Sequence, residues 1–315
     1  MFGVVFSNII IHYFPEYLIL FLLIIGSLAI LKKILCFIYS FYSYFLRREL
    51  NLSKRYGGGY ALVLGSTAGI GLQYCYEFAQ RGFNLITVSR NLEKIEKRKS
   101  EILAKFPKTD IKVLEADLAT IERTALLEKI QGITQDLDVS IIVANVGPGR
   151  FKDFDKIEYQ DIEKMIKGNI SNHTYICRFL IPRLISRKNK SAILFMSSGF
   201  EAGAIPFGSV YGACKAYIRT FAKQLDLEYS NKIDILSVSI GEIEIEIVEK
   251  KNLLFVQKPK PLPAKHLTFL GRAVVTPGCW QHSLNNLYLS YCKKKARYIG
   301  EEIKKIDAEI EKKEK

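Results

Sequence analysis

The sequence contains few cysteines and arranges none of them in pairs. Its 315 residues include six cysteines, which are scattered along the chain without a CxxC pair or a regular framework. This pattern excludes a disulfide scaffold and a zinc finger, and it is typical of reduced thiols in a protein that faces the cytosol. We therefore expect no metal site.

The sequence also lacks the composition of a disordered protein. Charged residues make up 25% of it and hydrophobic residues 49%, with only 21 glycines and 9 prolines. Such a chain can bury the core of one α/β domain of about 250 residues. The net charge of +14 suits nucleic acid, anionic lipid headgroups or an acidic ligand such as a coenzyme A thioester. Because no nucleic-acid-binding motif is visible, we expect a membrane surface and anionic cofactors, and no nucleic acid.

Positive charge is missing from the N-terminal segment. No Lys or Arg precedes Lys32, and no clear small-residue cleavage site follows the apolar stretch, which argues against a cleaved signal peptide. The uncharged run Tyr17 to Leu31 and the aromatic run Ile34 to Leu46 flank Lys32-Lys33. A spanning helix needs about 20 apolar residues. The segment therefore predicts a retained transmembrane anchor, and it leaves open whether residues 34–46 enter the bilayer.

Basic residues set the expected orientation of this anchor. Several of them follow it within residues 32–55, and positive flanks stay on the cytosolic side. The chain end, Lys312-Lys313-Glu314-Lys315, resembles the dilysine retrieval signal of endoplasmic reticulum membrane proteins, although a solvated charged tail is the alternative. We expect the endoplasmic reticulum membrane, with the catalytic domain in the cytosol. The expected parts are an anchor and juxtamembrane segment (1–56), a catalytic domain (57–283) and a helical charged tail (284–315).

Strands and helices alternate after the linker Gly57-Gly58-Gly59. Short apolar runs predict strands at Tyr60 to Leu64, Phe83 to Ser89, Ile111 to Ala116, Val139 to Ala144 and Ser191 to Met196. Helical patterns lie between them. The expected fold is α/β, a doubly wound parallel sheet of the Rossmann type with an N-terminal transmembrane anchor.

The first predicted strand leads into a glycine-rich loop. Glycines permit a tight turn there and let the backbone approach a pyrophosphate at the helix N-terminus. The second strand ends at Arg90 without a carboxylate, which favours the 2′-phosphate of NADPH over the free ribose of NADH. The predicted cofactor-binding residues of the loop are Gly65, Ser66, Thr67, Gly69, Ile70 and Gly71.

A catalytic pair follows the fifth strand. Tyr211 comes thirteen residues after Ser198, and Lys215 lies one helical turn further on. A tyrosine with a pKa of about 10 is a poor acid near neutrality. A neighbouring ammonium favours the phenolate and lowers that pKa, which suits proton transfer to a carbonyl oxygen. Lys215 can also hydrogen-bond the nicotinamide ribose, and a serine hydroxyl can hold the carbonyl oxygen.

These motifs, in this order, resemble the short-chain dehydrogenase/reductase family over about residues 58 to 245. The resemblance implies that Tyr211 is the general acid, Lys215 its modulator and Ser198 the residue that orients the substrate. It also implies that Asn169 belongs to the proton relay. Asp117 would contact the adenine, and Asn145, in Asn145-Val146-Gly147, would stabilise the central sheet. Ser197 is the less favoured of the two serines.

Two positions depart from the family pattern. Leu64 replaces a threonine at the start of the glycine loop, and Ile240-Gly241 replaces a Pro-Gly pair, with a further threonine replaced near Ile245. That segment normally touches the nicotinamide carboxamide. We expect these changes to alter cofactor affinity or loop order without removing a proton-transfer group.

The anchor and the motif wording resemble one branch of the family, the membrane-anchored very-long-chain 3-oxoacyl-CoA reductases and 17β-hydroxysteroid dehydrogenases. In such enzymes the part between Glu242 and Thr276 usually builds the substrate lid. The first reading is an NADPH-dependent 3-oxoacyl-CoA reductase of fatty-acid elongation. A dehydrogenase of steroids or other lipid alcohols, and a non-catalytic NADPH-binding membrane protein, are the alternatives. The sequence leaves open a homodimer and elongation-complex partners.

Overall fold

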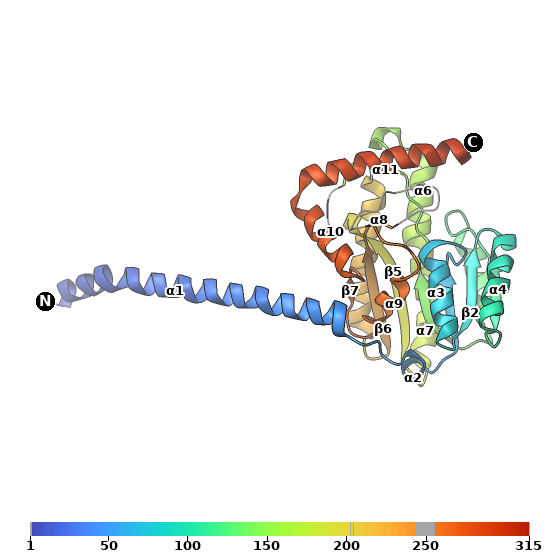
Figure 1. The fold of residues 1–315 in the computed structure, drawn as a ribbon, viewed down its shortest axis with the longest axis horizontal. Helices are drawn as coiled ribbons and strands as arrows, with labels where there is room; N and C mark the ends of the chain where they lie inside the picture. Colours follow the sequence, from blue (N-terminus) through green and yellow to red (C-terminus); the bar gives the residue numbers. More distant parts are fainter. Residues whose placement is uncertain (1, 202, 204, 244–255, 315) are drawn as a thin grey trace. The chain divides into compact units, whose positions relative to one another are not determined.

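The computed structural model describes residues 2–201, 203, 205–243 and 256–314. The chain divides into two compact units, Met1–Arg48 and Glu49–Lys315 (Figure 1). Ile245, near which a further family threonine is replaced, lies outside the described residues.

The first unit is helical. Helix α1 (Phe2–Phe41) continues through Lys32 and Lys33 without a break, and a π-helical turn, η1 (Tyr42–Leu46), ends it. Among the described residues, the segment Tyr17–Leu46 is long and apolar enough to cross a membrane. The second apolar run therefore extends the first helix instead of forming a separate element.

The second unit is built on a seven-stranded parallel sheet with the order β3-β2-β1-β4-β5-β6-β7. The predicted fold class is confirmed. All six residues of β4 are buried, as expected of a strand covered on both faces. The order reverses between β1 and β4, which opens a crevice at the carboxyl ends of the strands. The strands are β1 (Tyr60–Leu64), β2 (Asn84–Ser89), β3 (Ile111–Glu115), β4 (Val139–Ala144), β5 (Ser191–Ser198), β6 (Ile233–Ile240) and β7 (Val275–Thr276).

Helices cover both faces of this sheet (Figure 1). One apolar cluster joins the sheet to three of them, through side chains such as Leu126, Leu180 and Ile218. These three helices are α5 (Arg123–Thr134), α7 (Asn172–Ser186) and α8 (Ser209–Tyr229). The helices α3 (Gly69–Gln80) and α4 (Leu92–Lys105) follow β1 and β2, and α6 (Tyr159–Ile166) precedes the π-helical turn η3 (Lys167–Ser171).

The second unit begins before the glycine linker. Helix α2 (Leu52–Tyr56) lies in this unit, and both Leu52 and Tyr56 are buried. Arg55 and Tyr56 contact Asp234, at the start of β6. The compact unit therefore starts at Glu49, eight residues before the expected boundary at Gly57.

The described chain after residue 255 is largely helical. Helix α9 (Leu262–Leu267) packs on α3, where His266 Nδ1 lies 2.8 Å from the Tyr74 hydroxyl. Helices α10 (Trp280–Tyr291) and α11 (Lys293–Glu314) follow. Both have buried side chains, including Asn285, Ile299 and Asp307. The C-terminal segment is therefore part of the folded unit, not a solvated tail.

Candidate active site

The predicted catalytic side chains meet at the carboxyl end of β5. Ser198 ends this strand, and Tyr211 and Lys215 lie one turn apart on α8. The Lys215 ammonium is buried, donates a hydrogen bond to the Met196 carbonyl at 2.9 Å, and lies 5.4 Å from the centre of the Tyr211 ring. The Ser198 hydroxyl and the Tyr211 phenol line the same cavity. The fold thus brings together a phenol, a hydroxyl and an ammonium.

Burial dominates the titration of this pair. It raises the pKa of Tyr211 to about 12, against the opposing effect of the Ser198 hydroxyl. It lowers the pKa of Lys215 to about 8, although Cys214 and Glu201 favour the charged form. The expected lowering of the tyrosine pKa is therefore wrong for this structure, because desolvation of the phenolate is the largest effect on this side chain. Tyr211 is a proton donor at neutral pH.

Asn169 lies beneath these residues, in the π-helical turn η3. Its side-chain nitrogen donates to the carbonyls of Pro148 (2.8 Å) and Met165 (2.9 Å), whereas its buried Oδ1 has no hydrogen-bond partner among the described residues. A Cβ at Gly147 would lie 2.5 Å from Lys215 Nζ and 2.7 Å from Asn169 Oδ1. Only glycine therefore lets the chain pass over this pair.

The two neighbouring serines have different surroundings. The Ser197 hydroxyl is buried and contacts the Lys215 carbonyl (2.9 Å) and the Glu201 carboxylate, whereas Ser198 lines the cavity described below. Glu201 was not predicted from the sequence. Its fully buried carboxylate also accepts a hydrogen bond from Ser239 and lies 3.5 Å from Arg219. Burial raises its pKa in spite of these hydrogen bonds.

The glycine loop has the backbone that a pyrophosphate cradle requires. Gly65 and Gly69 adopt φ values of +77° and +56°. A Cβ at Gly71 would lie 2.0 Å from the Gly65 carbonyl oxygen, so any side chain there would open the loop. Asn145 Nδ2 donates to the same oxygen at 3.2 Å, which joins the end of β4 to the loop.

The remaining loop residues are held locally. Ser66 is buried and donates to the Val88 carbonyl, and the Thr67 hydroxyl lies 3.0 Å from that of Ser89. Ile70 is buried in the first turn of α3. Leu64 is also fully buried, so it packs in the core instead of lining the loop.

A second cavity, with several charged residues in its wall, lies near the carboxyl ends of the strands. Arg90 and Asp117 both line it, together with Thr120 and Pro148. Asp117 accepts a hydrogen bond from the Ala119 backbone at 2.9 Å, and no acidic residue replaces Arg90 after β2. The open loop, the orphaned Asn169 oxygen and this cavity fit a nicotinamide dinucleotide.

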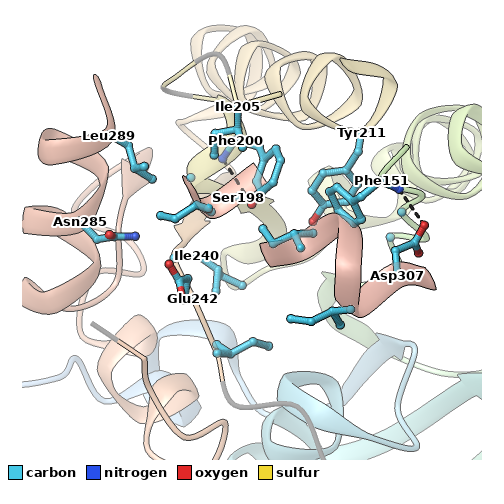
Figure 2. Close-up of a pocket in the computed structure, with 18 of the residues that line it drawn as sticks. Phe151, Ser198, Phe200, Ile205, Tyr211, Ile240, Glu242, Asn285, Leu289 and Asp307 are labelled. Atoms are coloured by element: carbon cyan, nitrogen blue, oxygen red, sulfur yellow. Dashed lines mark hydrogen bonds between the residues drawn. The ribbon is translucent and has the colours of Figure 1, made fainter. Parts of the chain in front are cut away.

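An apolar cavity of about 310 Å³ adjoins Tyr211 and Ser198 (Figure 2). The rings of Phe151 and Phe200 pack on Tyr211 with centroid distances of 5.2 and 5.4 Å. Ile240 lines the cavity, so the family departure at this position adds apolar surface. Gly241 is constrained by His282, since a Cβ would lie 2.7 Å from the imidazole ring.

The far wall of this cavity comes from the C-terminal helices, which the sequence did not predict to be there. Helix α10 contributes Asn285 and Leu289, and α11 contributes Asp307 and four isoleucines. Asp307 accepts a hydrogen bond from the Phe151 backbone at 2.9 Å, as Figure 2 shows. The apolar residues of the tail recur with the 3.6-residue period of a helix, which predicts that one face of this helix is buried. The sequence does not show which surface that face packs against.

Comparison with known proteins shows the family of the chain. Residues 59–253 match the family model described as short chain dehydrogenase. The human protein named inactive hydroxysteroid dehydrogenase-like protein 1 is 31% identical, and the match covers 86% of this chain and 85% of that protein. The human very-long-chain 3-oxoacyl-CoA reductase is 32% identical over 74% of this chain and 72% of its own length.

The fold also matches solved structures. A 7β-hydroxysteroid dehydrogenase superposes with a TM-score of 0.69 and 20% identity, and the match covers 80% of this chain and 99% of that one. At this identity the similarity supports the fold alone, and it agrees with the sheet order and the helices on both faces.

Proposed function

Because the chain belongs to the short chain dehydrogenase family, we propose that it is an NADPH-dependent reductase that converts a 3-oxoacyl-CoA to the 3-hydroxyacyl-CoA. The observation that carries this proposal is the position of Tyr211 and Ser198 on the wall of an apolar cavity, with Lys215 buried beside them. A protonated phenol at the edge of an apolar space suits the reduction of a carbonyl on a lipid-like substrate. The similarity to the human very-long-chain 3-oxoacyl-CoA reductase supports the substrate class.

The proposed chemistry uses the residues as they lie. NADPH, when bound, supplies the hydride for the carbonyl carbon. Ser198 donates a hydrogen bond to the carbonyl oxygen and holds it within reach of Tyr211. Tyr211 then gives its phenolic proton to that oxygen, so that one hydride and one proton convert C=O to CH–OH. Lys215 and the η3 turn around Asn169 form the path by which the phenolate regains a proton.

In this proposal, each of the predicted cofactor-binding residues contacts a particular part of NADPH or supports the site. The loop from Gly65 to Gly71 holds the pyrophosphate, and Asp117 and Asn145 border the adenosine side and the central sheet. Arg90 is exposed at the end of β2, where a 2′-phosphate would lie. The preference for NADPH over NADH rests on this arginine and on the absence of a carboxylate beside it.

The cellular setting is part of the same proposal. The helix Tyr17–Leu46 would anchor the chain in the endoplasmic reticulum membrane, with the catalytic unit in the cytosol, because basic residues follow the helix and none precedes it. A lipid-like substrate is concentrated at such a surface. A homodimer or an elongation-complex partner is compatible with this arrangement.

Two alternatives follow from the relatives. The first alternative is that the substrate is a steroid ketone, because one relative is named hydroxysteroid dehydrogenase-like protein 1. The second is that the chain binds NADPH without catalysis, because the same name contains the word inactive. The steroid reading shares all four proposed catalytic residues and differs only in the ligand of the cavity. The presence of Asn169, Ser198, Tyr211 and Lys215 in one site argues against the non-catalytic reading.

The test uses the full-length chain in membranes. NADPH oxidation is followed with a long-chain 3-oxoacyl-CoA and, separately, with a steroid ketone. Tyr211→Phe should lower turnover about 100-fold or more because it removes the proton donor, while NADPH binding, measured by fluorescence, stays unchanged. If only the steroid were turned over, the substrate would be a steroid ketone instead of a 3-oxoacyl-CoA. Bound NADPH with no turnover of either compound would favour the non-catalytic function.

A further inference from the structure

Helices α10 and α11 lie beyond the segment that matches the family model, which ends at residue 253. They nevertheless form the wall of the apolar cavity that faces Ser198 and Tyr211 (Figure 2). The family model therefore does not describe this wall, and its chemistry has to be derived from the residues of this chain.

The α11 part of the wall is a row of isoleucines. Ile299, Ile303, Ile306 and Ile310 all line the cavity, and their spacing of four, three and four residues places them on one face of the helix. Eleven residues of helix span about 16 Å at about 1.5 Å per residue. An apolar strip of this length fits an elongated apolar chain better than a small ketone.

Helix α11 is fixed against the loop that follows β4. Asp307 accepts the hydrogen bond from the Phe151 backbone, Lys304 pairs with Asp153 at 2.8 Å, and Lys152 pairs with Glu311 at 2.8 Å. These contacts fix the rotation of α11 about its axis. The isoleucine face is therefore held toward the cavity.

The α10 part of the wall carries an unsatisfied polar group. The side chain of Asn285 leaves α10 toward the cavity (Figure 2), and the residue is 1% exposed. Its Oδ1 has no hydrogen-bond partner among the described residues. A buried acceptor without a partner is costly, so its presence in a cavity wall indicates a ligand that donates to it.

We propose that α10 and α11 carry a two-part substrate subsite, in which Asn285 accepts a hydrogen bond from an N–H or O–H group of the substrate and the α11 isoleucines accommodate its apolar chain. This inference rests on the proposed reductase function and names the substrate class, an elongated amphipathic carbonyl compound. The donor is an amide N–H in an acyl thioester of pantetheine, or a hydroxyl in a hydroxysteroid.

The polar part is tested with Asn285→Leu in the full-length protein. The substrates are a long-chain 3-oxoacyl-CoA, the ethyl ester of the same 3-oxo acid, which has no N–H or O–H donor, and a hydroxysteroid ketone. We expect kcat/KM to fall about tenfold or more for the compound whose donor meets Asn285, and to stay within about twofold for the ethyl ester. Loss with the thioester identifies the amide, and loss with the hydroxysteroid identifies the hydroxyl.

The apolar part is tested with Ile306→Trp, which fills the cavity beside α11. We expect kcat/KM for a long-chain 3-oxoacyl-CoA to fall about tenfold or more relative to a short-chain one. The matched control is Leu287→Trp, because Leu287 is 56% exposed on α10 and lines neither cavity. The control should leave the ratio between the two chain lengths unchanged.

A binding readout separates this inference from the proposed reaction. If the wild-type protein binds NADPH but turns over no substrate, the reductase proposal fails. In that case, the binding of each compound can still be compared between wild type and Asn285→Leu. The measurement is the shift in melting temperature that the compound causes in the presence of NADPH. The polar part would be overturned if Asn285→Leu changed kcat/KM, or the melting-temperature shift, equally for the ethyl ester and both donor compounds. It would also be overturned if the variant changed neither quantity for any of the three compounds. An unchanged chain-length ratio in Ile306→Trp would overturn the apolar part.

Discussion

Burial shifts the two central titratable residues in opposite senses. Tyr211 has its pKa raised to about 12 and Lys215 has its pKa lowered to about 8, in each case chiefly because the charged form loses its hydration. At neutral pH the site therefore holds a neutral phenol beside a largely protonated amine. This is the protonation state that a reductase needs at the start of its reaction.

The lysine gives the site a predicted pH dependence. Its ammonium is present below a pH of about 8 and is lost as the pH rises through that value. We expect kcat/KM for NADPH to be flat from about pH 6.5 to about pH 7.5 and to fall up to tenfold per pH unit above about pH 8.5. Tyr211 does not titrate in this range. The measurement is the pH profile of NADPH oxidation at low cofactor concentration.

Lys215→Arg is the control for this assignment. A guanidinium keeps its charge throughout this range, so the variant should lose the inflection even if its overall activity is low. An inflection that persists in Lys215→Arg would assign the titration to another group.

At the scale of elements, the short helix α2 is joined to a strand that lies far away in the sequence. Arg55 lies 2.5 Å from Asp234, Tyr56 donates to the same carboxylate at 2.8 Å, and Lys190 lies 3.2 Å from it. Burial alone would raise the pKa of Asp234, but the hydrogen bonds from Arg55 and Tyr56 lower it below its ordinary value. One carboxylate thus joins α2 to the start of β6.

Removing that carboxylate should destabilise the catalytic unit. Asp234→Ala leaves Arg55, Tyr56 and Lys190 without their common partner, and we expect a loss of about 2–4 kcal/mol in the free energy of unfolding. Thermal unfolding in detergent measures it, with the exposed Asp136→Ala as the control. A melting temperature equal to that of the control would mean that the network contributes nothing to stability.

The features that could be predicted from the sequence are those that depend on neighbouring residues in the chain. The strands from Tyr60 to Leu64 and Val139 to Ala144 were predicted to the residue, because a parallel strand buried on both faces is a continuous apolar run. Tyr211 and Lys215 were paired correctly, because helical periodicity places them on one face. Both inferences use local spacing alone.

Contacts between residues that lie far apart in the sequence could not be predicted from local spacing. The bond between Phe151 and Asp307 joins residues 156 positions apart, and that between Tyr56 and Asp234 joins residues 178 apart. Nothing in the tail specifies which surface its isoleucines cover, and a glycine triplet after Tyr56 has the composition of a linker. The cavity wall, the start of the catalytic unit and the buried Glu201 all depend on such contacts.

At the scale of the whole molecule, the chain combines an exposed apolar helix with a unit that has its own core. Residues Glu49–Lys315 form one compact unit, and Tyr17–Leu46 is a helical segment of 30 residues that is long and apolar enough to cross a membrane. Such a helix suits the interior of a bilayer. Membrane attachment and catalysis should therefore be separable.

Two truncations test this separation and the position of the boundary. A chain that starts at Glu49 keeps Leu52, Arg55 and Tyr56, so we expect it to leave the membrane pellet, to bind NADPH as the full-length protein does, and to reduce a water-soluble 3-oxo thioester. A chain that starts at Gly57 loses these contacts with β6 and should melt at least about 5 °C lower. Sedimentation and thermal unfolding measure both variants. Equal melting temperatures would place the boundary at the glycines, and retention of the Glu49 variant in the pellet would show that the catalytic unit binds membranes without the helix.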